Sequence, residues 1–153
     1  MTITHEHMMA LTANMPMKCI EINGEPYLER YFAHMLADGT QVWYHRFLRN
    51  DSERHLHSHP WSAKSQILTG AYTEQREKHG DVVFVDRVVG EENYIFEATV
   101  HRIVKVEPNT WTQMIVRPER KSTWHFVDEN GKRTEMPTSP FEWHKDFQPR
   151  VAA

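Results

Sequence analysis

The sequence predicts an all-β domain, a sandwich or a barrel, on three observations. Short runs with strand-like alternation follow one another along the chain at roughly regular spacing. Turn signals separate these runs, among them Asn23-Gly24, a strong signal for a tight hairpin. No segment shows the long apolar period of an amphipathic helix. This combination favours antiparallel strands that close into a sandwich or barrel.

The strands expected from these signals cover most of the chain. Residues 27–36 fit a helical period as well as a strand period, so a helix stays open there. Residues 1–16 show no clear period, which predicts a loose N-terminal arm before a single domain over residues 17–153. The tail over residues 138–147 is expected as a short helix or an irregular flap. The expected strands are 19–22, 27–36, 41–49, 64–68, 71–75, 81–89, 93–98, 100–106 and 111–117, followed by a hairpin over 122–133.

Length and composition exclude several classes of protein. The 153 residues correspond to one domain, with 39% hydrophobic and 25% charged residues and no apolar run long enough to cross a bilayer. The single cysteine, Cys19, excludes a disulfide framework within the chain and fits a reduced, cytoplasmic setting. The net charge of −3 argues against nucleic acid as the main partner. We therefore expect a cytoplasmic protein that binds a small molecule, with no nucleic acid or membrane partner.

Alternating histidines are the most informative local pattern. His55, His57 and His59 alternate, which places their side chains on one face of an extended strand. Neutral imidazole is the commonest metal-ligating side chain. Three such positions span about 13 Å along a strand, so one straight strand cannot bring all three to one ion. A pair from this strand with a ligand from a neighbouring strand is the workable arrangement.

The segment HLHSHPWSAKSQILTGAYTE resembles the first sequence motif of the cupins. With His57 and His59 as its two histidines, ten residues precede Gly70, which is the family spacing, whereas His55 and His57 would leave twelve. The second cupin motif supplies one more histidine on a later strand, and His101 stands 42 residues after His59. Small bacterial and phage cupin-like proteins of mostly unassigned function resemble this chain over four further runs, residues 45–61, 70–74, 101–103 and 111–112.

The resemblance implies a cupin-type double-stranded β-helix, or jelly-roll barrel, that forms a homodimer. It also implies that His57, His59 and His101 hold one divalent transition metal. Iron is favoured for this position, and Mn, Ni, Co and Zn are alternatives.

The chain departs from the family at the usual glutamate position. Ala63 and Lys64 stand where the family has that carboxylate. Glu74, on the strand after Gly70 and in phase with Tyr72, is the expected substitute. It would act as a fourth metal ligand or as a general base.

For function, the resemblance implies a metal-dependent cupin oxidoreductase, a dioxygenase of the Fe(II) type that acts on a small polar or anionic substrate. 2-Oxoglutarate oxygenases use two histidines and one carboxylate with H-x-D/E spacing, whereas this chain has His57-Ser58-His59, which argues against that class. Tyr72 is expected to donate a proton or a hydrogen bond, and Arg46 or Lys105 to orient an anionic substrate. A non-oxidative isomerase, lyase or epimerase on a sugar or keto acid, and a ligand-binding module without turnover, stay open.

Overall fold

The computed structural model describes residues 1–50, 55–138 and 147–150 and contains one helix besides its strands. The tail expected as a helix or flap falls mostly on residues 139–146, which lie outside the described residues. The elements are α1 (His5–Thr12), β1 (Pro16–Ile22), β2 (Glu25–Met35), β3 (Gln41–Phe47), β4 (Leu56–His57), β5 (Ala63–Thr69), β6 (Ala71–Lys78), β7 (Asp81–Val88), β8 (Glu92–Ile95), β9 (His101–Val106), β10 (Thr110–Val116), β11 (Thr123–Val127), β12 (Arg133–Pro137) and β13 (Gln148–Pro149).

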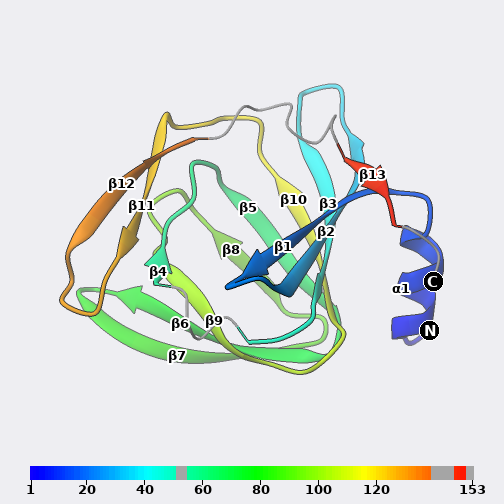
Figure 1. The fold of residues 1–153 in the computed structure, drawn as a ribbon, viewed down its shortest axis with the longest axis horizontal. Coiled ribbons are helices and arrows are strands. Elements are labelled where there is room, and N and C mark those ends of the chain that lie inside the picture. The colour runs from blue at the N-terminus through cyan, green and yellow to red at the C-terminus, as the bar shows by residue number, and fades with distance from the viewer. Residues whose placement is uncertain (51–54, 139–146, 151–153) are drawn as a thin grey trace.

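The strands form two antiparallel sheets that face each other around the core (Figure 1). The seven-stranded sheet has the order β13-β1-β2-β3-β10-β5-β8, and the six-stranded sheet has the order β12-β11-β4-β9-β6-β7. Several consecutive strands, such as β4 and β5 or β9 and β10, lie in different sheets, so the chain winds between the two layers. This winding is the jelly-roll arrangement, and the predicted all-β fold is confirmed.

Residues 27–36, which left helix and strand open, form most of strand β2. β2 pairs with β1 and β3 on its two sides, so its backbone hydrogen bonds are made within the sheet. Asn23 and Gly24 join β1 to β2 with φ angles of 52° and 79°. Two consecutive positive φ angles match the twist of a two-residue hairpin, as the Asn-Gly pair predicts.

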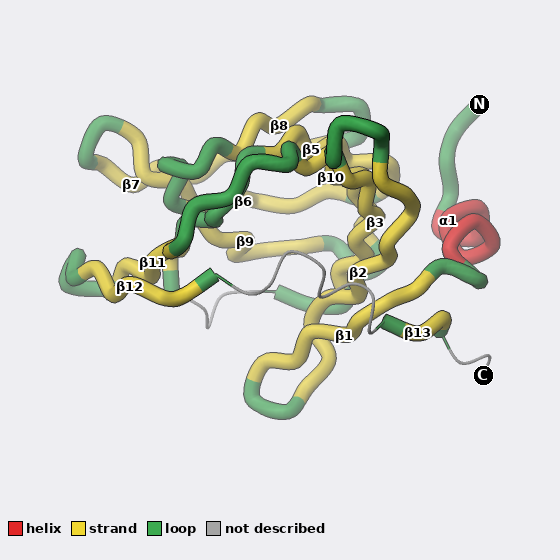
Figure 2. Tube along the Cα trace, turned by 90° about the horizontal axis from the view of Figure 1, so that it is seen from above, coloured by secondary structure: helices red, strands yellow, loops and turns green. Residues whose placement is uncertain are grey.

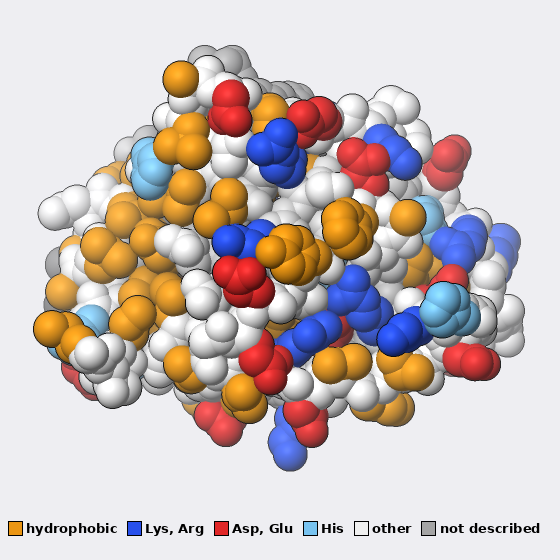
Figure 3. All heavy atoms as spheres, turned by 180° about the vertical axis from the view of Figure 1, so that it is seen from behind, with side chains coloured by type: hydrophobic (Ala, Val, Ile, Leu, Met, Phe, Trp, Pro, Cys, Tyr) orange, Lys and Arg blue, Asp and Glu red, His pale blue; other side chains and the backbone are white. Residues whose placement is uncertain are grey.

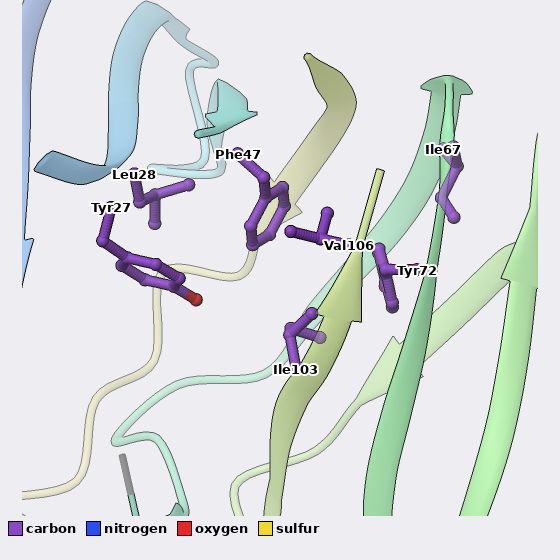
Figure 4. Close-up of a cluster of buried hydrophobic side chains, with 7 residues drawn as sticks. All are labelled: Tyr27, Leu28, Phe47, Ile67, Tyr72, Ile103 and Val106. Atoms are coloured by element: carbon purple, nitrogen blue, oxygen red, sulfur yellow. The ribbon is translucent and has the colours of Figure 1, made fainter. Parts of the chain in front are cut away.

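A cluster of buried apolar side chains lies between the two sheets (Figure 4). Both sheets contribute to it, which holds the two layers together through burial of apolar surface. The seven-stranded sheet or the residues next to it supply Tyr27, Leu28, Phe47 and Ile67, and the six-stranded sheet supplies Tyr72, Ile103 and Val106.

The N-terminal segment is not the loose arm that the sequence led us to expect. Helix α1 lies outside the barrel beside β13 (Figure 2). It begins with a capping box, in which the Thr4 side chain accepts from the His7 N–H while His7 Nδ1 accepts from the Thr4 N–H, both at 3.2 Å. No helix in the described part of the chain has the length and apolar character that a membrane crossing requires.

Packing explains why such a short helix is ordered. Met8 is 2% exposed and packs against Tyr31 and Trp111, which are completely buried. The Trp111 Nε1–H donates to His5 Nδ1 at 3.0 Å. Eight residues are too few for a helical period to stand out in the sequence, so tertiary contacts decide this element.

Gly70, in the turn from β5 to β6, allows that turn to touch the start of β10. Its φ angle of +85° favours glycine, and a Cβ at this position would lie 2.3 Å from Thr110 Oγ1 and 2.8 Å from Thr110 Cα. The Thr110 hydroxyl lies 3.2 Å from the Ala71 nitrogen, which donates to it. The cupin motif glycine therefore has a packing reason in this chain.

Gly70→Ala is expected to lower the free energy of unfolding by roughly 2–4 kcal/mol, because left-handed strain adds to overlap with Thr110. Gly80→Ala is the matched control, since Gly80 has a φ angle of +83° and open space around it. We expect the control to lose only about 1 kcal/mol. Urea unfolding of both variants measures the difference, and equal losses would contradict the contact with Thr110.

Candidate metal centre

Three histidines meet inside the barrel, two from neighbouring strands of the six-stranded sheet and one from the loop after β4. His57 ends β4 and pairs directly with His101, the first residue of β9. His59 follows two positions after His57. The centroids of the three rings are 5.0, 5.1 and 5.3 Å apart, and one ring nitrogen from each lies within 4.8 Å of the others. The structure thus brings together the three histidines that the sequence singled out.

Hydrogen bonds fix the orientation of two of these rings. His57 Nδ1 lies 3.0 Å from the carbonyl oxygen of His55, which can only accept, so Nδ1 carries the proton. His101 Nδ1 lies 2.9 Å from the Glu74 carboxylate, which fixes the same tautomer. In the neutral form of both rings, Nε2 is therefore unprotonated and available to an ion. Such partners orient ligating histidines in metal proteins.

The backbone between His57 and His59 is held by strand β11. The Ser58 N–H donates to the His125 carbonyl at 2.9 Å, and the His125 N–H donates to the Ser58 hydroxyl oxygen at 3.0 Å. The same hydroxyl lies 3.0 Å from His125 Nδ1. Ser58 is buried, so these contacts position the residue that separates two of the three histidines.

Glu74, from β6, does not lie in the group of side chains that could share one ion among the described residues. Its carboxylate is completely buried and accepts from His101 Nδ1 (2.9 Å), Asn93 Nδ2 (2.9 Å), Arg76 Nη1 (3.1 Å) and Arg87 Nη2 (3.2 Å). The sequence favoured Glu74 as a fourth ligand or a general base. The structure instead puts its carboxylate on the Nδ1 side of His101, where it positions that ring.

The charge of Glu74 is stabilised by these same contacts. Burial alone would raise the pKa of this carboxyl group, but the hydrogen bond and charge of His101, followed by Asn93 and Arg76, outweigh burial and lower the pKa to about 2. Glu74 is therefore ionised at neutral pH. An ionised carboxylate is the strongest partner for the Nδ1–H of His101.

The three histidines line a cavity of about 310 Å³ between the sheets, a volume suited to a small molecule. Four cationic side chains line it as well, and no carboxylate does so among the described residues. Trp61, next to His59 with ring centroids 4.3 Å apart, forms part of the wall. The four cations are Lys18, Arg30, Arg102 and Arg120.

Tyr72, the hydrogen-bond donor that the sequence singled out, lines this cavity. Burial, followed by the nearby charge of Glu74, raises the pKa of Tyr72 to about 12. The phenol therefore keeps its proton at neutral pH and can donate it in a hydrogen bond.

His45 also lines the cavity. It shares the inner face of β3 with Trp43 and Phe47. Burial, followed by the charge of Arg30, lowers the pKa of His45 well below its usual range. A neutral imidazole with one N–H therefore faces the cavity.

Arg46 does not line the cavity, although the sequence predicted that it orients a substrate. It alternates with His45 and Phe47, so it projects from the opposite face of β3. There its guanidinium contacts Glu29 at 3.0 Å and Asn109 at 2.9 and 3.1 Å.

Lys105 does not line the cavity either, and the reason is a β-bulge. The pairing of β6 with β9 skips one residue between Ile103 and Lys105. The bulge reverses the alternation, so that Val106 is buried and Lys105 is exposed. Strict alternation from His101 and Ile103 would have placed Lys105 inside.

The cationic residues that do line the cavity were not singled out from the sequence. Arg30 is the clearest example. The hairpin register could have identified it. The Asn23-Gly24 turn sets the pairing of Lys18 with Arg30, and the pairing of β2 with β3 places Arg30 beside His45. A sequence alone shows which residues alternate within a strand, but it does not show which strands are neighbours in the barrel.

No protein-family model matches the chain, and no curated protein is significantly similar to it. Solved structures do match its fold. A cupin 2 conserved barrel domain protein from Rhodopseudomonas palustris has a TM-score of 0.55 at 14% identity, with 78% of this chain and 79% of that chain covered. A variant of the oxalate decarboxylase OxdC from Bacillus subtilis has a TM-score of 0.56 at 12% identity, covering 71% and 28%.

A third match is the Fe(II) structure of HppE, with a TM-score of 0.54 at 9% identity, covering 66% of this chain. This chain spans 56% of the length of HppE and about a quarter of the oxalate decarboxylase chain. At these identities the likeness is one of fold. Two facing antiparallel sheets, the winding of the chain between them and these structural matches lead to one conclusion: the chain has the cupin fold.

Proposed function

We propose that this chain is a mononuclear metal-dependent cupin enzyme, a dioxygenase of the Fe(II) type that acts on a small anionic substrate without 2-oxoglutarate. The observation that carries the proposal is the cluster of His57, His59 and His101 inside a cavity of molecular size. The fold similarity to the Fe(II) structure of HppE supports iron as the ion.

The donor set fits a divalent transition metal. Imidazole suits Fe, Co, Ni, Cu and Zn, and a site without a carboxylate differs from the two-histidine, one-carboxylate set of 2-oxoglutarate oxygenases. Three neutral rings leave the full positive charge of the ion in place. When bound, Fe(II) would supply the oxygen chemistry of the reaction, while Mn, Ni, Co and Zn stay alternatives.

The cavity walls support an anionic substrate. Four cations line the cavity and the described lining contains no carboxylate, so a negative group there meets attraction from several sides. Tyr72, protonated at neutral pH, donates a hydrogen bond to the bound molecule. The Trp61 ring covers part of the wall and helps to exclude water, which strengthens these electrostatic contacts.

A non-oxidative reaction is the second candidate, and the protonated Tyr72 beside the histidine cavity favours it. A phenol that keeps its proton can transfer it to a carbanion or alkoxide in an isomerase or lyase, with the metal polarising a carbonyl. Consumption of oxygen by the iron-loaded protein favours the dioxygenase. Turnover without oxygen favours the isomerase or lyase, and ligand binding without product favours a binding module.

The metal content of the purified protein tests the proposal directly. Protein from metal-replete cells is expected to contain about one divalent ion per chain, and replacing His57 and His59 together by alanine is expected to abolish it, because one remaining imidazole cannot hold the ion. His79→Ala, at an exposed turn, is the control and should retain the ion. Elemental analysis gives the result, and full metal in the double variant would overturn the site.

Glu74→Gln tests the positioning of His101. The amide can no longer accept from His101 Nδ1 with a full negative charge, so metal affinity is expected to fall about 10–100-fold. Glu92→Gln, which removes an exposed partner of Lys64, is the control and should leave affinity unchanged. Competition with a metal-binding dye measures both affinities. Unchanged affinity in Glu74→Gln would show that the carboxylate does not support the ring.

The homodimer expected from the resemblance stays a prediction. Strands β7 and β8 each end a sheet, and apolar side chains on or next to them are exposed, among them Phe84 (67%) and Phe96 (59%). The view from behind shows hydrophobic side chains exposed among charged ones (Figure 3). Light scattering is expected to give the mass of two chains, and Phe84→Lys should shift it towards one. A monomeric mass for the unmodified protein would contradict the expectation.

A further inference from the structure

A row of polar side chains crosses the cavity face of the seven-stranded sheet. Lys18 pairs with Arg30, Arg30 with His45, and His45 with Thr112, so four neighbouring strands place these residues side by side. All four line the cavity. Two of the four side chains, Lys18 and Arg30, carry positive charge, which favours a negative group in front of the row.

The cavity continues from this row into a smaller recess of about 50 Å³. Arg30, His45 and Arg120 line both spaces, so the recess opens beside the polar row. The described residues that line it include no carboxylate. The rest of its lining is formed by Gln41, Trp43, Trp61, Met114 and Val116.

Gln41 supplies the recess with a buried donor. The residue is 2% exposed, and its Oε1 accepts from the Trp43 Nε1–H at 3.0 Å. This contact fixes the amide orientation, because the indole can only donate. Gln41 Nε2 is then the free end, and it has no hydrogen-bond partner among the described residues.

Thr112 repeats this situation in the adjoining wall of the main cavity. The residue is 1% exposed, and its hydroxyl has no hydrogen-bond partner among the described residues. Buried polar groups in native proteins are nearly always hydrogen-bonded. Two such groups beside two arginines therefore indicate a ligand that accepts hydrogen bonds and carries negative charge.

We infer that this recess binds the carboxylate of the substrate through Arg30, Arg120, His45 and Gln41. A recess of this size has room for only a few heavy atoms, which suits a flat carboxylate better than a tetrahedral phosphate or phosphonate. Guanidinium groups bind carboxylates through two parallel hydrogen bonds. The Trp43 and Trp61 rings, also in the lining, provide apolar walls for the group.

This inference rests on the proposed function only in taking the carboxylate as part of the substrate. The substrate is then a small carboxylic acid, held by its carboxylate at the seven-stranded sheet while its reacting part faces the three histidines of the six-stranded sheet. Holding one end in this way orients the other end for reaction.

Propanoate and propanamide, which share a shape and differ in charge, test the recess. We expect propanoate to shift the Trp43 indole N–H signal in NMR spectra with a Kd on the order of 1 mM, and propanamide to leave it in place. The same shift is expected in the variant with His57 and His59 replaced by alanine, where an ion cannot bind propanoate. No propanoate shift, an equal shift with propanamide, or tighter binding of methylphosphonate would overturn the inference.

Gln41→Glu provides a second test that does not depend on loss of structure. The new carboxylate still accepts from Trp43 Nε1, and it places a negative charge among the recess cations. We expect a higher Tm and at least about 10-fold weaker propanoate binding, because the recess already holds its anion. Gln113→Glu, the same change on the outer face of β10, is the control and should alter neither.

A lower Tm for Gln41→Glu together with unchanged propanoate binding would overturn the inference. The metal content of the same samples, measured by elemental analysis, distinguishes failure of the recess from failure of the proposed function. Protein that binds propanoate but no metal supports the recess and contradicts the enzyme. Protein that binds metal but no propanoate supports the metal site and contradicts the recess.

Discussion

The buried carboxylate of Glu74 is the contact on which the site most depends. It joins four elements, because His101 belongs to β9, Arg87 to β7 and Asn93 to β8, while Glu74 itself lies on β6. β8 belongs to the seven-stranded sheet and the other three strands to the six-stranded sheet, so this one side chain connects the two layers. An ionised carboxylate that is shielded from solvent requires hydrogen-bonding or charged partners, since burial of an unpaired charge is strongly unfavourable. The orientation of a histidine is thus coupled to the closure of the barrel.

The two sheets contribute different chemistry to one cavity. The six-stranded sheet and its adjoining loop supply the three histidines, and Tyr72 lies on the same sheet. Among the described lining residues, the seven-stranded sheet supplies Arg30, His45 and Thr112, and His45 is the only histidine among them. Lys18 and Arg30 thus lie on the sheet opposite the histidines, whereas Arg102 follows His101 on β9. Cationic side chains from both sheets therefore line the cavity, and they favour binding of an anionic molecule.

The sequence predicted what depends on spacing within a strand and missed what depends on neighbours across strands. The spacing of His57 and His59 to Gly70, and the later His101, match the cupin motif, and this resemblance implied both the fold and the three rings that meet. Alternation alone misplaced Lys105, because a bulge reversed the alternation of β9. Other misplacements had different causes.

Arg46 shows a different limit of sequence analysis. Alternation with His45 indicated the face of β3 from which Arg46 projects, but it did not identify the partners Glu29 and Asn109. Glu74 was assigned to the right strand face, but no pattern reveals on which side of an imidazole a carboxylate lies. Helix α1 was missed because its order depends on Tyr31 and Trp111, which are distant in sequence. Register between strands would have been needed for each of these contacts.

The contacts between Ser58 and His125 connect the histidine site to strand β11, near the edge of the six-stranded sheet. Among the described residues, β12 is the outer neighbour of β11, and it ends the sheet and is largely exposed. Terminal hairpins of this kind open at lower free energy than the strands behind them. When this hairpin opens, the backbone between His57 and His59 loses its hydrogen bonds while the rest of the barrel stays closed. We therefore expect the separation of two of the three histidines to respond to local unfolding at the sheet edge before the domain unfolds as a whole.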